Sequence, residues 1–409
     1  MLAAMPPTPD ATGAGSAVPD RGRSDACPGA LRLHTADDGG LARIRLPGGL
    51  LTERQALALA EAAAALGDGE PEITSRGNVQ LRGLASGCGA ELAERLRAVG
   101  LLPSDTHERV RNIVASPGPS DGHADVRAWA RELDAALCAS PWATALSGKF
   151  LFALDDGRGD VAALDADVTL VAGPDGTALL RLGRAATARP VPADRAVAAA
   201  LAAAHEFLDA LRAAGRSAWH LREVPDLLPA GPAELPAFAA APPQLGPLPG
   251  GLAVGLRFGR ASLAQWRVLA DAAEGELRLT PWRGVVLPGA SAARLPDLEA
   301  AGFRTAAGTA WDGASACTGL PGCAKSLADV RADAARALTA APAAGLRVHW
   351  SGCERRCGHP AGRWVDVLAT GQGYRVAPVG TPAPPTDVTA VDVTTEEMAE
   401  AVAEARRTT

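Results

Sequence analysis

The sequence predicts an α+β protein built by internal duplication, and three observations carry this prediction. Strand-like and helix-like patterns alternate along the chain. The order strand, helix, strand at residues 41–84 returns at 251–289, beyond a Pro-rich passage. Four of the seven cysteines fall in the last quarter of the 409 residues, in two closely spaced pairs. Two related halves and a region that holds a metal or a cluster are therefore expected.

The composition narrows the classes of protein to which the chain can belong. The formal net charge is −6 and the isoelectric point is about 5.7, which disfavours a nucleic-acid binder that depends on a global positive field. Few cysteines, no basic N-terminal leader and no long uncharged apolar run predict a cytoplasmic protein without a membrane segment. Basic residues must therefore act locally.

The first half is predicted element by element. Residues 1–30 are rich in Pro, Gly and Ala and predict a disordered tail. The first half-domain, 31–103, is expected to contain the following elements: a strand at 41–49, a helix at 51–66 with Thr52 as its N-cap, an alternating strand at 71–84 and a helix near 88–99. A strand, helix, strand, helix unit results.

A second region is expected at 104–223. It begins with a loop at 107–119 and a helix that runs to about residue 138. Three short strands follow in SGKFLFALDD, DVTLVAG and TALLRLG, and then an Ala-rich helix at 191–215. Residues 224–250 are Pro-rich and predict a linker between the halves.

Beyond the linker, residues 251–305 predict a second half-domain and 306–409 a cluster-binding domain. TSRGNVQLRG (74–83) and TPWRGVVLPG (280–289) align without gaps, and the identical pairs are Thr74 with Thr280, Val79 with Val285, Leu81 with Leu287 and Gly83 with Gly289. This agreement predicts pseudo-twofold symmetry, and such halves commonly leave a ligand cleft where they meet.

The four late cysteines form a C-x5-C pair and a C-x3-C pair separated by 29 residues. Four thiolates from two short loops suit either a tetrahedral zinc ion or an iron–sulfur cluster, and the five-residue gap favours the larger cubane. Four buried cysteines in unrelated loops are the alternative without a cofactor. Cys27, Cys88 and Cys138 are isolated and are expected to be structural.

The segments ACTGLPGCAKS, WSGCERRCGHP and EITSRGNVQLRG resemble the sulfite and nitrite reductase family, and within it the cobalamin-biosynthesis branch. The resemblance covers almost all of the chain after the tail. It implies two pseudo-symmetric ferredoxin-like half-domains, reductase-type α/β domains, a tetrapyrrole in a central cleft, and a [4Fe-4S] cluster held by Cys317, Cys323, Cys353 and Cys357.

The same resemblance implies residues that bind the carboxylates of the tetrapyrrole, for which the planar fork of Arg is suited. Arg76 of ITSRGNVQ matches one such residue, Arg111 of VRNIV resembles a second, and Lys149 lies on the family's lysine-bearing strand. Arg283 is a candidate counterpart in the repeat, although the ungapped alignment sets Trp282 opposite Arg76. An arginine on an exposed strand is more often a solvated surface charge.

Three departures separate the chain from the reductases. They commonly carry a second basic residue two positions after the lysine, where this chain has Leu151, and a Pro-Asn pair where Glu354 and Arg355 stand. The chain is also shorter than is usual for them. These differences favour the cobalamin branch, whose reaction is hydroxylation of precorrin-3A at C20 with dioxygen and γ-lactone formation. A sirohaem-dependent sulfite or nitrite reductase is the alternative, and a zinc-bearing binding module is a third possibility.

The expected cofactors and partners follow from the resemblance. They are the [4Fe-4S] cluster, a mononuclear non-haem iron in some members of the branch, precorrin-3A, dioxygen and a separate donor of NADH-derived electrons. Sirohaem is expected under the alternative alone. No G-x-G-x-x-G follows a strand, so nicotinamide is not expected to bind this chain. Lys325 could neutralise the cluster. His349 and His359 flank the second cysteine pair but are not assigned as ligands, and no catalytic residue is assigned.

Overall fold

The computed structural model describes residues 25–118, 122–239, 241–340, 345–360, 362–380 and 390–407. The chain divides into two compact units. The N-terminal unit comprises the described residues up to His34 together with Leu41–Thr305, and the C-terminal unit comprises Thr35–Gly40 and the described residues from Ala306 onward.

Residues 34–98 and 246–300 form two half-domains whose elements follow in the same order, except that β3 has no counterpart strand in the second. The first contains β1 (His34–Ala36), β2 (Gly39–Ile44), β3 (Leu50–Thr52), α1 (Glu53–Leu66), β4 (Glu72–Ile73), β5 (Val79–Leu84) and α2 (Gly89–Ala98). The second contains β12 (Gly246–Leu248), β13 (Gly251–Gly255), α5 (Leu263–Ala272), β14 (Glu276–Leu279), β15 (Gly284–Pro288) and α6 (Leu295–Ala300). The sheets have the orders β1-β2-β5-β4 and β12-β13-β15-β14-β3.

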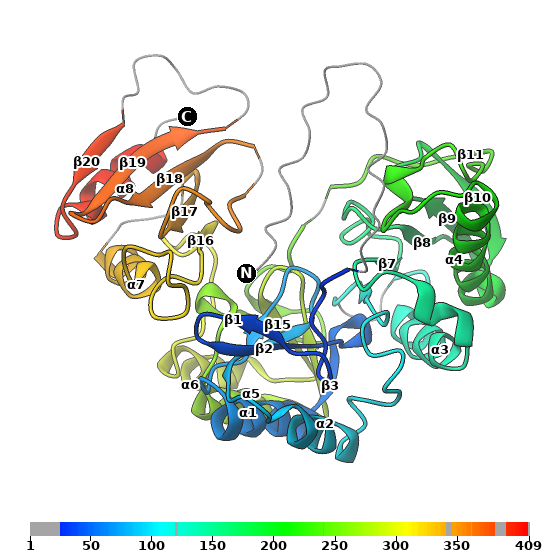
Figure 1. Ribbon diagram of the computed structural model, residues 1–409, viewed down its shortest axis with the longest axis horizontal. Coiled ribbons are helices and arrows are strands. Elements are labelled where there is room, and N and C mark those ends of the chain that lie inside the picture. Colours follow the sequence, from blue (N-terminus) through cyan, green and yellow to red (C-terminus); the bar gives the residue numbers. More distant parts are fainter. Residues whose placement is uncertain are drawn as a thin grey trace. The chain divides into compact units, whose positions relative to one another are not determined.

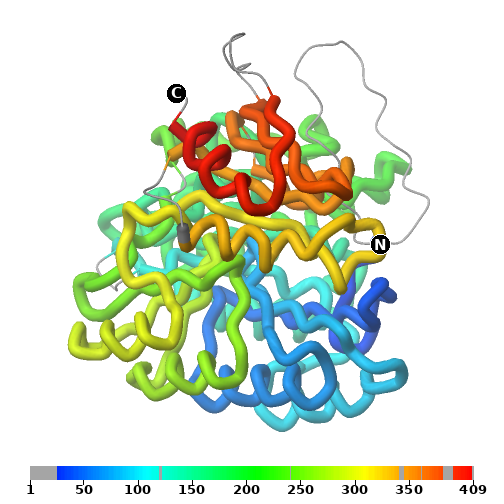
Figure 2. Tube along the Cα trace, turned by 90° about the vertical axis from the view of Figure 1, so that its left-hand side faces the viewer, coloured from blue at the N-terminus to red at the C-terminus, as the bar shows by residue number. Residues whose placement is uncertain are grey.

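The two half-domains exchange strand contacts in a reciprocal way. β3 of the first half-domain pairs antiparallel with β14 of the second. In return, Arg260 of the second half-domain forms an antiparallel bridge with Glu72 of β4. Helices α1 and α5 pack together, and one hydrophobic core runs through both halves, from Ile44 and Leu59 to Trp266 and Leu298. Figure 2 shows the two segments, blue and yellow-green, side by side.

The helix caps of the two half-domains repeat as well as the order of their elements, which supports the duplication. Thr52 and Gln55 form a capping box at the start of α1, and Ser262 and Gln265 form the same box at the start of α5. Each glutamine also donates from Nε2 to a carbonyl near the end of its half-domain, Gln55 to Val99 at 3.0 Å and Gln265 to Ala301 at 2.9 Å.

The stretch 71–84, expected as one strand, is a hairpin of β4 and β5. Its tight turn begins at Thr74, whose Oγ1 accepts from the Asn78 N–H at 3.2 Å, and Gly77 has a φ of 67°. The turn after β14 is the same: Thr280 Oγ1 accepts from Gly284 N–H at 3.2 Å, and Arg283 has a φ of 60°. Hence Arg283 takes the place of Gly77, and Trp282 stands at the position of Arg76, as the ungapped alignment predicts.

A third sheet, with six strands, lies in the N-terminal unit and has its own core. Its elements are β6 (Ile113–Ala115), α3 (Val126–Cys138), β7 (Phe152–Asp155), β8 (Val168–Ala172), β9 (Thr177–Leu182), β10 (Thr187–Pro192), α4 (Ala196–Ala213) and β11 (Ala233–Glu234). Strands β6, β7 and β8 are parallel neighbours, and β9, β10 and β11 follow antiparallel. Helices α3 and α4 pack on this sheet (Figure 1).

The C-terminal unit repeats that arrangement. It contains β16 (Ala314–Ala316), α7 (Val330–Ala340), β17 (Arg347–Ser351), β18 (Trp364–Ala369), β19 (Tyr374–Val379), β20 (Val391–Val393) and α8 (Met398–Arg407). Again three parallel neighbours, β16, β17 and β18, precede two antiparallel strands, with one helix after the first strand and one after the last. The duplication therefore includes the α/β sheets as well as the half-domains.

Two of the expected boundaries differ in the structure. Asp25, Cys27 and Ala30, expected in the tail, are buried, because Asp25 accepts from Ser147 Oγ and Gly148 N–H and Glu108 accepts from the Ala30 N–H. The rest of that tail lies outside the described residues. The expected linker contains β11 and β12. Within the described part of the chain, no helix is long and apolar enough to cross a membrane.

Candidate functional site

The two cysteine pairs lie at the carboxyl ends of neighbouring parallel strands. Cys317 directly follows β16, and Cys353 lies two residues beyond β17. The Cys317 N–H donates to Trp350 O at 2.9 Å, and the Gly352 N–H donates to Cys317 Sγ at 3.2 Å. A backbone N–H aimed at a cysteine sulfur is the arrangement that iron–sulfur sites use to stabilise thiolate charge.

The loops interlock at Gly352. The Leu327 N–H donates to Gly352 O at 2.8 Å, and a Cβ at position 352 would collide with Ser326 Oγ. No larger side chain fits there unless the loop that carries Cys323 moves away. The lack of a side chain at Gly352 therefore lets the two cysteine loops approach each other closely.

Side chains from β17 and β18 hold the second cysteine loop. His349 Nε2 donates to Cys357 O at 3.1 Å, since a carbonyl can only accept, and its Nδ1 accepts from Ser315 Oγ at 2.9 Å. Arg356 Nε donates to Asp366 at 2.6 Å. His359 stacks on Trp364 with ring centroids 5.2 Å apart. His349 is therefore a positioning residue for the loop, with both ring nitrogens bonded within the protein.

The electrostatics of Cys317 show that one other cysteine of the two pairs, Cys357, lies close enough to act on it. Burial raises the pKa of the Cys317 thiol, the N–H groups of Gly352 and Gly319 lower it, and the neighbouring Cys357 raises it again. All four cysteines are free thiols and half-buried, while Lys325 is exposed. A cofactor that binds thiolates would offset this cost of burial.

Three arginines converge in the N-terminal unit. Arg43 and Arg45 lie on β2 and at its end, two residues apart and hence on one face, and Arg76 lies in the β4–β5 turn. Burial, followed by the charges of Arg43 and Arg76, lowers the pKa of Arg45 to about 9. Burial likewise lowers the pKa of Arg76. This arginine cluster (Arg43, Arg45 and Arg76) concentrates positive charge that an anionic ligand would relieve.

Neutral oxygens orient the arginine cluster. Arg76 Nη1 donates to Lys149 O at 2.9 Å, Arg43 Nη2 to Gln80 Oε1 at 2.9 Å, and Arg45 Nη2 to Gly148 O at 3.4 Å. Lys149 Nζ lies 4.1 Å from the centre of the Trp219 ring. The structure therefore brings two of the four predicted carboxylate ligands, Arg76 and Lys149, into direct contact.

The other two predicted ligands are placed differently. Arg111 is buried and forms a two-pronged ion pair with Asp134 at 2.6 and 2.7 Å, while its Nη1 donates to Leu101 O. Arg283 occupies the left-handed position of its turn and packs against Gly259. Trp282, the counterpart of Arg76, packs against the apolar cluster that contains Leu151 and Val114. The repeat thus has an aromatic ring where the first half has a cation.

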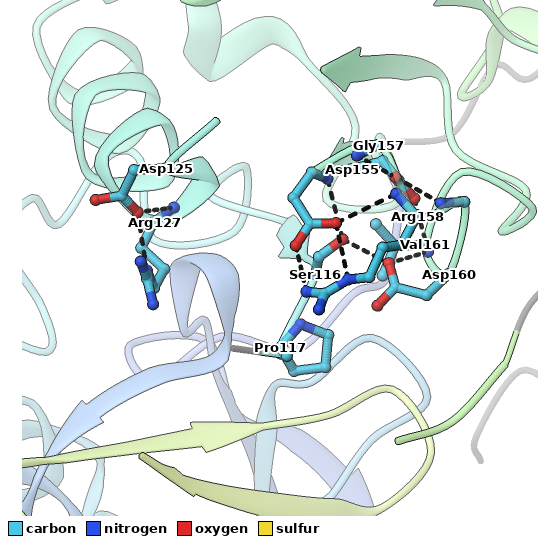
Figure 3. Close-up of polar contacts among 12 residues, drawn as sticks. Ser116, Pro117, Asp125, Arg127, Asp155, Gly157, Arg158, Asp160 and Val161 are labelled. Carbon is cyan, nitrogen blue, oxygen red and sulfur yellow. Dashed lines mark hydrogen bonds and ion pairs between the residues drawn. The ribbon is translucent and has the colours of Figure 1, made fainter. Parts of the chain in front are cut away.

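Asp155, Asp156 and Asp160 form a group of three carboxylates that sequence analysis did not identify, and their oxygens lie within 4.8 Å of one another. Figure 3 shows Asp155 and Asp160 of this group. Each carboxylate already has protein partners. Asp155 accepts four backbone N–H groups of the loop after β7, Arg158 pairs with Asp156, and Ser116 Oγ donates to Asp160. The three carboxylates hold the loop after β7 in place, and these protein partners account for their close approach without a bound ion.

The comparisons with known proteins agree with the fold. Residues 34–99 and 249–301 match the nitrite/sulfite reductase ferredoxin-like half domain. The chain is 30% identical to a precorrin-3B synthase of a Sinorhizobium species over 381 residues, which is 86% of this chain and 82% of the relative. It is 29% identical to a ferredoxin–nitrite reductase of Synechococcus elongatus, over 78% and 74% of the two chains.

Among solved structures, the NirA protein of Mycobacterium tuberculosis has the same fold, with a TM-score of 0.65 and 20% identity over 88% of this chain and 79% of that one. The fold and the duplicated half-domains define a protein of the nitrite and sulfite reductase class. Within that class, the chain belongs to the precorrin-3B synthase family.

Sequence reasoning missed part of the arginine cluster and its surroundings. Arg43 and Arg45 form an Arg-Ile-Arg pattern on a strand, and this alternation could have marked a charged face. Trp219 and Asp167 had no local signal. Asp167 is fully buried, accepts from His220 Nδ1 at 3.0 Å and lies near enough to Arg76 to raise the pKa of that arginine. These contacts arise from the tertiary fold.

Proposed function

We propose that this protein is a monooxygenase that hydroxylates precorrin-3A at C20 with closure of a γ-lactone, in aerobic cobalamin biosynthesis. The observation that carries the choice is Leu151. Where the resemblance places a second cation in the reductases, this chain has a side chain buried among Val114, Ala153 and Val161, with Trp282 packed against them. An apolar wall there suits a macrocycle and dioxygen better than a small oxyanion, which needs positive charge.

Cys317, Cys323, Cys353 and Cys357 are proposed to hold a [4Fe-4S] cluster. The sulfurs come from loops at one sheet edge, with N–H groups of Gly352 and Gly319 directed at Cys317. Among the described residues, no three of these sulfurs lie within 4.8 Å of one another. A tetrahedral zinc site with Zn–S bonds of about 2.3 Å would bring them closer than that. When bound, the cluster supplies electrons one at a time.

The arginine cluster and Lys149 are proposed to bind the substrate carboxylates. Each guanidinium is held by a neutral oxygen, so it keeps its charge and further N–H donors for an anionic ligand. Arg111 and Arg283 are proposed to act on this site indirectly, Arg111 through its ion pair with Asp134 and Arg283 through its turn.

The reaction balances with one oxygen atom transferred to the substrate. Precorrin-3A, O2 and two electrons with two protons give the C20 hydroxyl product and one water. The ring A acetate O–H then adds across a double bond at the carbon next to C20, so that the lactone C–O bond replaces a π bond, the acetate proton remains on the macrocycle, and no further oxidant is needed. The electrons are proposed to derive from NADH through a separate donor protein. A mononuclear non-haem iron is a further proposed cofactor, with no ligands assigned.

Turnover of precorrin-3A with labelled dioxygen tests the proposed reaction directly. Anaerobically purified protein is supplied with precorrin-3A, a chemical or protein reductant and ¹⁸O2, and the product is analysed by mass spectrometry. We expect one ¹⁸O atom in the macrocycle. Absence of oxygen-dependent product from cluster-loaded protein would overturn the assignment.

The alternative is a sirohaem-dependent sulfite or nitrite reductase, which the similarity to the ferredoxin–nitrite reductase favours. Sirohaem gives a sharp Soret-type band and a red band, whereas a cluster alone gives a broad shoulder. The absorption spectrum of the purified protein therefore separates the two.

A further inference from the structure

The duplicated α/β sheets contain two versions of the same loop pair. The Ser116 N–H donates to Leu154 O at 3.0 Å, as the Cys317 N–H donates to Trp350 O at 2.9 Å. Ser116 Oγ accepts from the Asp156 N–H at 3.2 Å, as Cys317 Sγ accepts from the Gly352 N–H at 3.2 Å. Ser116 is therefore the structural counterpart of Cys317.

This equivalence pairs Ser351 with Asp155. Both residues end the middle parallel strand, directly after Trp350 and Leu154. The Asp155 carboxylate fills the loop of its copy, accepting from the N–H groups of Gly157 and Gly159 with one oxygen and Val161 and Ala162 with the other, at 2.8 to 3.0 Å (Figure 3). A carboxylate in one copy is thus replaced by a hydroxyl in the copy that carries the cysteines.

The sheet register shows which way Ser351 faces. Trp350 faces helix α8, because its Nε1 contacts Met398 Sδ, so Ser351 faces the opposite side of β17. His349 lies on that same side and bonds Cys357 O, which places the second cysteine loop over it. Among the described residues Ser351 is fully buried and its Oγ has no hydrogen-bond partner.

A buried hydroxyl without a partner is costly, so such a group usually marks a missing acceptor. We propose that the Ser351 hydroxyl donates a hydrogen bond to the sulfur atoms of the cluster held by the two cysteine pairs. The proposal rests on the cluster part of the proposed function and is independent of the substrate. A donor to the sulfur shell stabilises the reduced cluster, which carries one more negative charge, and so raises its reduction potential.

The test uses the full chain with three variants of this position. Ser351→Ala removes the donor, Ser351→Thr keeps it, and Ser351→Asp introduces the carboxylate of the other copy. Ser326→Ala is the matched control, because its buried hydroxyl already donates to Ala328 O at 2.8 Å. Iron and acid-labile sulfide are quantified, and the midpoint potential is measured by dye-mediated titration followed by electron paramagnetic resonance.

We expect Ser351→Ala to keep its cluster with a lower midpoint potential, and Ser351→Thr and Ser326→Ala to match the wild type. Ser351→Asp should fail to take up the cluster, because its carboxylate occupies the loop N–H groups and repels the anionic cluster. An unchanged potential in cluster-loaded Ser351→Ala overturns the proposal, as does equal loss of cluster in the Ala and Thr variants. If the wild-type protein contains no iron and sulfide, the [4Fe-4S] cluster in the proposed function is wrong.

Discussion

The arginine cluster shows how single residues concentrate positive charge at a cost in stability. Arg45 is 2% exposed, and burial together with Arg43 and Arg76 brings its pKa to about 9. Three guanidiniums that destabilise one another are held in place by Gly148, Gln80 and Lys149. A ligand rich in carboxylates would remove this repulsion.

Replacing Arg76 should weaken binding of the macrocycle without affecting the cluster. Loss of a charge-assisted, two-pronged contact predicts about 10- to 100-fold weaker binding in Arg76→Ala. Binding is measured by anaerobic optical titration with precorrin-3A, and iron is quantified in parallel. Arg95→Ala, whose side chain is exposed and pairs with Glu91, is the control. Equal affinity of the Arg76 variant and the wild type would contradict the assignment.

Asp160 should make the protein less stable as the pH rises. Burial, reinforced by the charges of Asp155 and Asp156 and opposed by the Ser116 hydrogen bond, raises the pKa of Asp160 from 3.8 to about 6. Between these values the folded state holds a proton that the unfolded state has lost, so the stability from this group is present below about pH 4 and lost through pH 6. Asparagine cannot ionise.

The melting temperature of Asp160→Asn relative to wild type should therefore increase from pH 4 to pH 7, as measured by scanning calorimetry. Asp105→Asn provides a control that should stay flat over this range, because Arg97 lowers the pKa of Asp105 and the titration of that carboxyl therefore lies below pH 4. A difference for the Asp160 variant that stays flat or falls with pH would show that burial does not hold this carboxyl protonated.

At the scale of elements, the pair of cysteine loops determines the geometry of the candidate cluster site, and the pair of helix caps determines how each half-domain begins and ends. The cysteine loops meet because β16 and β17 are parallel neighbours, and Gly352 allows them to touch. The half-domains use the same capping box twice, so a helix start and the end of its half-domain are joined by one glutamine side chain.

Gly352→Ala should lower cluster occupancy while the fold persists. The added Cβ would collide with Ser326 Oγ and push the Cys323 loop away from Cys317. Iron and sulfide per chain are compared with those of Gly89→Ala, where the added Cβ meets its nearest neighbour, Leu33, at 3.8 Å. Full occupancy in the Gly352 variant would mean that the loops are less constrained than the contact indicates.

Gln265→Ala should destabilise the protein by about 1 to 2 kcal/mol, through loss of the reciprocal cap and of the bond to Ala301. Gln55→Ala makes the same losses in the first half-domain and should cost a similar amount. Urea unfolding of both variants measures this. Strongly unequal costs would argue that the two boxes do not play equivalent roles.

At the scale of the whole chain, duplication provides two scaffolds and substitution differentiates them. In one sheet, the neighbouring strands β6 and β7 lead to Ser116 and Asp155, and carboxylates hold the loop that follows. In the other sheet, β16 and β17 lead to Cys317 and Ser351. One half-domain turn presents Arg76 and the other Trp282. Each proposed site therefore belongs to one copy.

Cys353→Ser should abolish the cluster and turnover while precorrin-3A binding survives, because the arginine cluster belongs to the N-terminal unit. Metal and sulfide analysis and anaerobic titration are carried out on the same preparation. Loss of tetrapyrrole binding together with the cluster would show that the two sites are not independent.

Much of this architecture could be predicted from local patterns. The Thr52 cap, the helices α1, α3 and α4, and the repeat of the Thr74 and Thr280 turns follow from residue order. The hairpin at 71–84 was missed because both of its strands continue one alternating pattern. The boundaries at residues 25–30 depend on Glu108 and Ser147, which are distant in sequence.

The sequence by itself determined the duplicated α+β class, the cysteine spacing and the candidate basic residues, because periodicity and motifs are properties of neighbouring residues. The tertiary structure alone decided which arginines meet, that Arg111 pairs with Asp134 and that Ser351 faces the cysteine loops. Those outcomes depend on strand register and on contacts between segments far apart in the chain, which no local pattern encodes.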